Sequence, residues 1–157
     1  FCGLPAEAVA VGVDGCGVPV FGLPLLAVAC AYARLAEGVE PAASRVISAC
    51  LAHPEMIGGE GRICTEAMHA VPGLLAKTGA EGGYALALTG RGLGVALKVE
   101  DGAARAVHAA VVEVLAQLGA LSEAGAAALE RWRNPEVKNF RGEVVGEVKP
   151  VFRLPGR

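Results

Sequence analysis

Lys77 has the residue type and position in this sequence that most need a chemical explanation. It lies in the stretch LLAKTGAEGGYALALT (residues 74–89), where Lys77, Thr78 and Gly79 interrupt an apolar, strand-like pattern. A lysine in a buried strand is costly unless its ammonium group has a partner or a task. The residues leave two alternatives open. Lys77 is either a chance or salt-bridged structural lysine, or a lysine whose charge or proton serves a reaction in an enzyme.

Two further groups of residues carry side chains with chemical potential. The turn Asp14-Gly15-Cys16-Gly17 combines a carboxylate with a thiol, and on the residues alone it is a plain turn with a buried thiol. Cys64 follows the glycine-rich stretch IGGEGR (residues 57–62), and on the residues alone it is a core residue at a helix start. Glu60 and Arg62 in that stretch either pair across the loop or contact a substrate.

The remaining cysteines and the histidines favour structural roles. The five cysteines, at positions 2, 16, 30, 50 and 64, are odd in number and form no C-x-x-C pair. Cys30 and Cys50 fall in apolar helical patterns, so we expect small core residues in a reducing compartment, the cytoplasm. The histidines at 53, 69 and 108 lie beside helical apolar faces or a proline, and we expect structural or surface positions for them.

The composition indicates a globular domain. The chain has 157 residues, 54% of them hydrophobic and 19% charged, which suffices for one domain with a core. The formal net charge of −2 gives no basic face for nucleic acid or anionic membranes. The longest apolar run, residues 18–33, is interrupted by Pro19, Gly22 and Pro24 and is shorter than a membrane span.

The hydrophobic periodicity predicts alternating helices and strands. We expect a buried strand over residues 9–13, helices over 24–37 and 41–52, a short helix over 65–70, strands over 74–78, 83–88 and 94–99, helices over 103–118 and 122–132, and an edge strand within 143–152. Gly38 is expected to end the first helix and Ser122 to cap the last. Three consecutive strands followed by a long helix predict an α+β fold, with helices packed on an antiparallel sheet.

The quoted blocks carry a resemblance to known families. A K-T-G strand followed by a hairpin and a long helix resembles the serine β-lactamases and penicillin-binding proteins, in which the strand lysine and hydroxyl line the pocket. More specifically, GLPAEAVAVGVDGCGVPVFGLPLLAVACAYARLA, HPEMIGGEGRICTEAM and LLAKTGAEGGYALAL resemble the later half of the bacterial asparaginase II family, the rhizobial-type L-asparaginases. The resemblance runs from about residue 4 to 148. It implies a serine β-lactamase- and glutaminase-like fold.

The resemblance also implies a function and a set of site residues. It implies hydrolysis of L-asparagine to aspartate and ammonia through a serine acyl-enzyme. Lys77 and Thr78 match catalytic pocket positions, and Asp14 and Cys16 match a zinc site beside the pocket. Cys64, and with it Glu60 and Arg62, are expected to bind substrate. The family further implies a homodimer when full length.

The nucleophile of that family is missing from this sequence. None of Ser44, Ser48 and Ser122 has a lysine three residues later, so no S-x-x-K pair is present. The chain also begins with Phe1. We therefore expect residues 1–157 to be the C-terminal part of a single asparaginase II-like domain, inactive alone, with the serine and the remaining zinc ligands in an earlier half. The alternatives are a non-catalytic relic or binding domain of the same fold, and a glutaminase or β-lactamase-like hydrolase.

Overall fold

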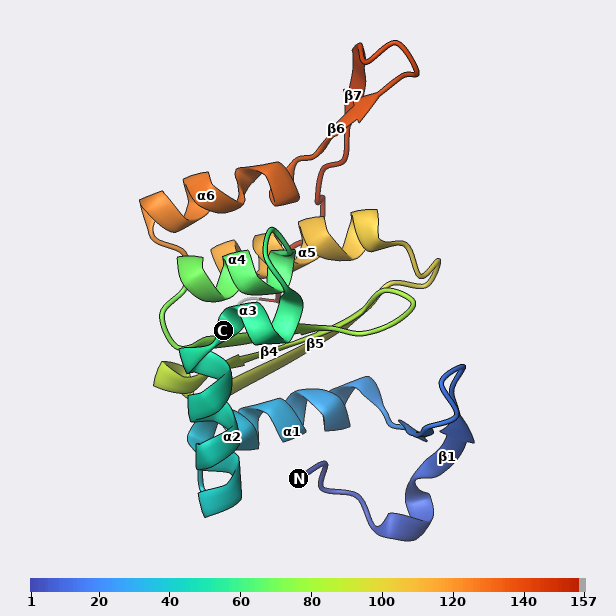
Figure 1. Cartoon of the computed structure of the whole chain (residues 1–157), viewed down its shortest axis with the longest axis vertical. Helices are drawn as coiled ribbons and strands as arrows, with labels where there is room; N and C mark the ends of the chain where they lie inside the picture. The colour runs from blue at the N-terminus through green and yellow to red at the C-terminus, as the bar shows by residue number, and fades with distance from the viewer. Residues whose placement is uncertain (156–157) are drawn as a thin grey trace.

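A three-stranded antiparallel sheet forms the centre of the molecule, whose computed structural model describes residues 1–155 (Figure 1). Its strands are β3 (Leu74–Thr78), β4 (Gly83–Leu88) and β5 (Leu93–Lys98), in the order β3-β4-β5. Lys77 pairs with Ala85 and Thr78 with Tyr84. The two stretches 74–78 and 83–88 are strands as predicted, and the third strand lies one residue earlier than expected. Because β3 is an edge strand, its outer backbone groups need partners other than a strand.

Helix α1 (Leu25–Glu37) covers one face of the sheet and packs along β4 and β5 (Figure 1). Pro24 precedes its first turn, and Gly38 ends it in the left-handed conformation with φ of 60°, as predicted. The helix crosses β5 at Gly94, where any side chain would collide with the backbone of Ala29 and Ala33. A glycine in this strand therefore allows the close approach of helix and sheet.

The other face of the sheet is covered by α4 (Ile63–Ala70) and α5 (Ala104–Gln117), with α6 (Glu123–Arg133) packed on both helices (Figure 1). Between these layers lies the core, in which Leu74, Leu86 and Leu115 are fully buried. Ser122 Oγ caps α6 by accepting from Gly125 N at 3.1 Å, as predicted. A Cβ on Gly125 would lie 2.9 Å from the Ala70 carbonyl oxygen, so close packing explains a glycine in the first turn of this helix.

Helices α2 (Pro41–Ala52) and α3 (Pro54–Gly58) lead from α1 to α4. α2 has the predicted bounds, whereas α3 was not predicted because its five residues run into the glycine-rich stretch that suggested a loop. The remaining loop, residues 59–62, is shorter than expected, and α4 begins two residues earlier.

Two hairpins project from this body (Figure 1). The first follows the short 3-10 helix η1 (Ala6–Ala8) and joins β1 (Ala10–Val13) to β2 (Pro19–Gly22); the second joins β6 (Glu136–Lys138) to β7 (Val144–Glu147). All residues of these four strands are exposed, so the prediction of a buried first strand is wrong. The first hairpin exposes a large apolar surface, which includes Val11, Val13 and Phe21. Cys30 is also exposed rather than a core residue.

The observed architecture confirms the predicted α+β class. Helices and small antiparallel sheets alternate along the chain, and one core joins the central sheet to its covering helices. Between residues 1 and 155, no helix is both long and apolar enough to cross a membrane.

Candidate functional site

A groove of about 530 Å³ lies at the end of β3 that carries Lys77. Three parts of the fold form it: the strand ends of the central sheet, the first two turns of α1, and the segment that connects β2 to α1. Its lining residues are Leu23, Leu25, Val28, Tyr32, Lys77, Thr78, Gly79, Gly83, Tyr84, Ala85, Ala96, Leu97 and Lys98. The groove is therefore largely apolar, with a few polar groups gathered at the strand ends, as is usual for small-molecule sites.

Lys77 lies on the wall of this groove with an exposed side chain. Its Nζ donates a hydrogen bond to the backbone oxygen of Thr78 at 2.8 Å. No ion pair within residues 1–155 involves Lys77, so the salt-bridged alternative finds no partner there. The lysine is exposed because the end of this edge strand opens into the groove. An ammonium group in such a position is accessible to a ligand.

Thr78 offers both a hydroxyl and a backbone amide at the same strand end. Its Oγ1 donates to the Gly79 carbonyl at 3.4 Å, a long and exposed hydrogen bond. Its backbone N–H donates to Cys64 Sγ at 3.2 Å. The hydroxyl is thus held loosely and the amide is held by a buried group.

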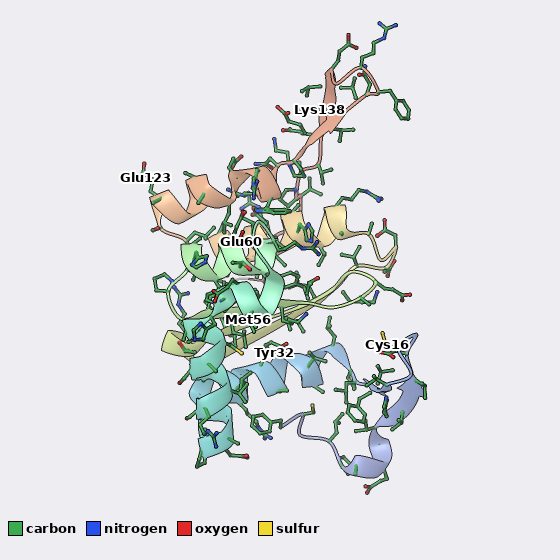
Figure 2. All side chains as sticks on the ribbon, viewed as in Figure 1. Cys16, Tyr32, Met56, Glu60, Glu123 and Lys138 are labelled. Carbon is green, nitrogen blue, oxygen red and sulfur yellow. The ribbon has the colours of Figure 1, made fainter. Side chains whose placement is uncertain are left out.

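Two tyrosines line the groove from opposite layers. Tyr84 on β4 is 3% exposed, and its hydroxyl donates to Cys64 Sγ at 3.2 Å. Burial, together with the adjacent Cys64, raises the pKa of Tyr84 far above its ordinary value, so the phenol stays protonated. Tyr32 lies on the side of α1 that faces the sheet (Figure 2), and burial likewise raises the pKa of its phenol. Both hydroxyls are therefore hydrogen-bond donors at neutral pH.

Cys64 is 1% exposed in the first turn of α4 and does not line the groove. The thiol is buried, as expected of a core residue at a helix start, and its two hydrogen-bond partners are groove residues. The expected contact of Cys64 with a substrate stays a prediction. Glu60 and Arg62 lie exposed in the loop between α3 and α4 and do not line the groove. Figure 2 shows Glu60 beside α4, across the sheet from α1.

Asp14 and Cys16 lie at the tip of the β1–β2 hairpin, where Figure 2 labels Cys16. Asp14 Oδ1 accepts hydrogen bonds from the backbone amides of Cys16 at 2.8 Å and Val18 at 3.0 Å. These two hydrogen bonds stabilise the turn, and neither of them uses the second carboxylate oxygen of Asp14. Both residues are exposed, so the interpretation of Cys16 as a buried thiol is wrong. Within residues 1–155, no three His, Cys, Asp or Glu side chains gather as a metal site.

Comparison with known families identifies the family of this chain. The family model described as L-asparaginase II matches residues 1–150. The chain belongs to the L-asparaginase II family. A search of curated proteins gives no match. The L-asparaginase II match includes every groove residue and the Asp14–Cys16 turn, and it indicates an asparaginase-like hydrolase with a small-molecule substrate such as asparagine.

Sequence reasoning missed three of the groove residues with polar side chains in this asparaginase II chain: Tyr32, Tyr84 and Lys98. Tyr32 was read only as part of a helical apolar face, and Tyr84 and Lys98 only as strand residues. A signal was available for Tyr84, because a tyrosine in a buried strand needs a partner for its hydroxyl. Lys98 donates to the carbonyls of Glu81 and Val99, which ties β5 to the β3–β4 turn. No sequence signal pointed to that contact.

Proposed function

We propose that this chain supplies one wall of the active site of an L-asparagine amidohydrolase, which converts asparagine to aspartate and ammonia. The observation that carries the proposal is the L-asparaginase II match together with Lys77 and Thr78 at the mouth of the groove. The groove holds positive and hydroxyl groups at one end and apolar side chains elsewhere. Such a site is suited to a small polar substrate.

The proposed reaction uses a serine from outside residues 1–157. Two of the chain's own serines have structural roles, since Ser44 Oγ donates to the Gly38 carbonyl at 2.8 Å and Ser122 caps α6. Ser48 has no lysine three residues later. The attacking hydroxyl forms an ester with the side-chain carbonyl carbon of asparagine, the C–N bond breaks, and the hydroxyl proton leaves on ammonia. Water then cleaves the ester to release aspartate and restore the serine.

In this proposal Lys77 provides the charge on the chain's side of the site. Its ammonium stabilises negative charge that develops on the carbonyl oxygen or on the attacking hydroxyl, and it can relay a proton between them. Its bond to the Thr78 carbonyl is exposed, so re-aiming the amine toward a substrate costs little. The Thr78 hydroxyl, held by a 3.4 Å bond, is available as a second donor.

Zinc belongs to the proposal as well. Asp14 and Cys16 are residue types that bind zinc. Asp14 offers the carboxylate oxygen that the turn hydrogen bonds do not use, and Cys16 offers its exposed sulfur. A structural zinc takes about four ligands, so the others come from outside this set of residues. A bound zinc would supply a strong positive charge.

The same proposal assigns the chain to a larger unit. Residues 1–157 form the C-terminal part of one serine β-lactamase-like domain in a cytoplasmic homodimer. The exposed apolar residues of the first hairpin support an interface there, because monomeric proteins rarely leave such patches uncovered.

The decisive experiment compares substrates on the full-length parent protein. Ammonia release is measured with asparagine and with glutamine, and ring opening is measured with a β-lactam. We expect the largest kcat/KM for asparagine. A preference for glutamine or the β-lactam would assign the groove to another hydrolase, and no turnover of any of the three would favour a non-catalytic domain.

A further inference from the structure

The thiol of Cys64 links the first turn of α4 to the strand end that carries Lys77. It accepts two hydrogen bonds, from the backbone N–H of Thr78 and from the hydroxyl of Tyr84, each at 3.2 Å. The sulfur is buried, whereas both partners line the groove. A ligand in the groove therefore meets Thr78 and Tyr84, and the thiol lies behind them.

The amide of Thr78 needs this acceptor because β3 is an edge strand. Gly79 N–H donates to the Gly83 carbonyl at 2.8 Å, and alternate residues of an antiparallel strand direct their amides to opposite sides. The Thr78 amide thus points away from β4, to the side of β3 where no other strand lies within residues 1–155. Without the sulfur, the last residues of β3 would be free to fray, and Lys77 with them.

The first turn of α4 is itself held firmly in place. The single hydroxyl proton of Thr65 is shared between the carbonyl oxygens of Gly59 and Pro54, which lie 2.7 Å and 3.2 Å from Oγ1. Gly58 packs so closely that a Cβ there would lie 2.9 Å from Cys64 Cβ and from Thr65 Oγ1. A rigid helix start therefore presents the sulfur, and the strand end is positioned by it.

We propose that Cys64 is a positioning residue, which acts through Thr78 and Tyr84 to hold Lys77 in place at the groove without touching the substrate. The proposal rests on the asparaginase function proposed above and deepens it. It assigns Cys64 a role different from the substrate contact predicted from the sequence.

The rival explanation is that Cys64 is simply a small apolar core residue. Two substitutions of Cys64 distinguish this explanation from the positioning role. A core residue tolerates Cys64→Ala better than Cys64→Ser, since serine buries a hydroxyl. A hydrogen-bond acceptor predicts the reverse order, because the serine oxygen still accepts from both donors and alanine accepts from neither. Cys50→Ala is the matched control, a half-buried cysteine of α2 that makes no side-chain hydrogen bond within residues 1–155.

The first measurement is amide hydrogen exchange of Thr78 in the 157-residue chain, followed by NMR. We expect roughly tenfold faster exchange in Cys64→Ala, within about threefold of the parent in Cys64→Ser, and no change in Cys50→Ala. Faster exchange in the serine variant than in the alanine variant would overturn the proposal. If Cys64→Ala does not fold, Tyr84→Phe is used instead, because it removes one of the two donors to the sulfur. Thr78 exchange that is the same in Tyr84→Phe, Cys64→Ser and Cys50→Ala supports the sulfur–amide link. Loss of Thr78 protection in Cys64→Ser overturns it.

The second measurement is asparagine hydrolysis by the full-length parent. Cys64→Ala should lower kcat roughly tenfold with KM within about twofold, and Cys64→Ser should recover most of kcat. Faster Thr78 exchange with unchanged kcat would overturn the positioning role. A parent that does not hydrolyse asparagine refutes the proposed function instead, and the exchange experiment still decides whether Cys64 holds the strand end.

Discussion

Gly58→Ala tests whether the packing behind the groove positions the strand end. A Cβ at this position would lie 2.9 Å from Cys64 Cβ, whereas carbon atoms in contact are about 3.5–4.0 Å apart. The helix start must therefore retreat by roughly 0.6–1.1 Å. A shift of that size away from β3 would lengthen the 3.2 Å bond between Thr78 N and Cys64 Sγ to about 3.8–4.3 Å, at or beyond the limit of a hydrogen bond to sulfur.

The energetic consequence follows from two opposed effects. Overpacking costs about 1–3 kcal/mol, and the better helix propensity of alanine in α3 returns up to about 1 kcal/mol. The net loss lies between about 0 and 3 kcal/mol, and its midpoint of about 1.5 kcal/mol corresponds to a fall in Tm of roughly 3–6 °C for a chain of this size. Thr78 amide exchange should rise at the same time.

The assay is thermal unfolding followed by circular dichroism, with Gly90→Ala as the control. Gly90 has open space around it and no positive φ, so alanine should change little there. A Tm for Gly58→Ala within about 1 °C of the control, with unchanged Thr78 exchange, would refute the idea that this contact positions α4.

Three further predictions concern charge and metal. Burial alone raises the pKa of Glu113, but hydrogen bonds from Gln117 and Arg133 outweigh burial and leave the pKa lowered. The stability that this carboxylate contributes is therefore present above about pH 4.3 and is lost as the pH falls through the lowered pKa. Urea unfolding of Glu113→Gln at a series of pH values should lack that loss. Burial and then the charge of Arg62 lower the pKa of His108, so stability falls as acid protonates it below about pH 6.5; NMR titration of Arg62→Gln should show a smaller lowering. Metal analysis of the purified parent should find zinc that Cys16→Ala loses, and an equal zinc content would remove Cys16 from the ligands.

The central sheet and its helices were predictable because their signals are local. The apolar runs at 74–78 and 83–88 are bounded by glycine and proline, and Gly38 and Ser122 mark helix ends by their backbone and side-chain chemistry. The two hairpins were harder to predict. Their strands of three or four residues are exposed on both faces, so no alternation of polar and apolar residues marks them.

The site was only partly predictable for a related physical reason. Lys77 and Thr78 were found because their types contradict the strand pattern around them. The link between Cys64 and Tyr84 joins residues on a helix and a strand, and sequence spacing does not show which side chains meet across layers. The exposure of Lys77 follows from the position of β3 at the sheet edge, which depends on strand order and not on the residues near the lysine.

The most direct test of the central claim is the rate of ammonia release from asparagine by the full-length parent carrying Lys77→Ala. Lys138→Ala is the control, because Figure 2 shows that lysine on the distant β6–β7 hairpin. We expect Lys77→Ala to lower kcat by roughly a hundredfold or more, with Tm nearly unchanged since the side chain is exposed, and Lys138→Ala to remain within about twofold of the parent. Equal kcat values for the parent and Lys77→Ala would contradict the account.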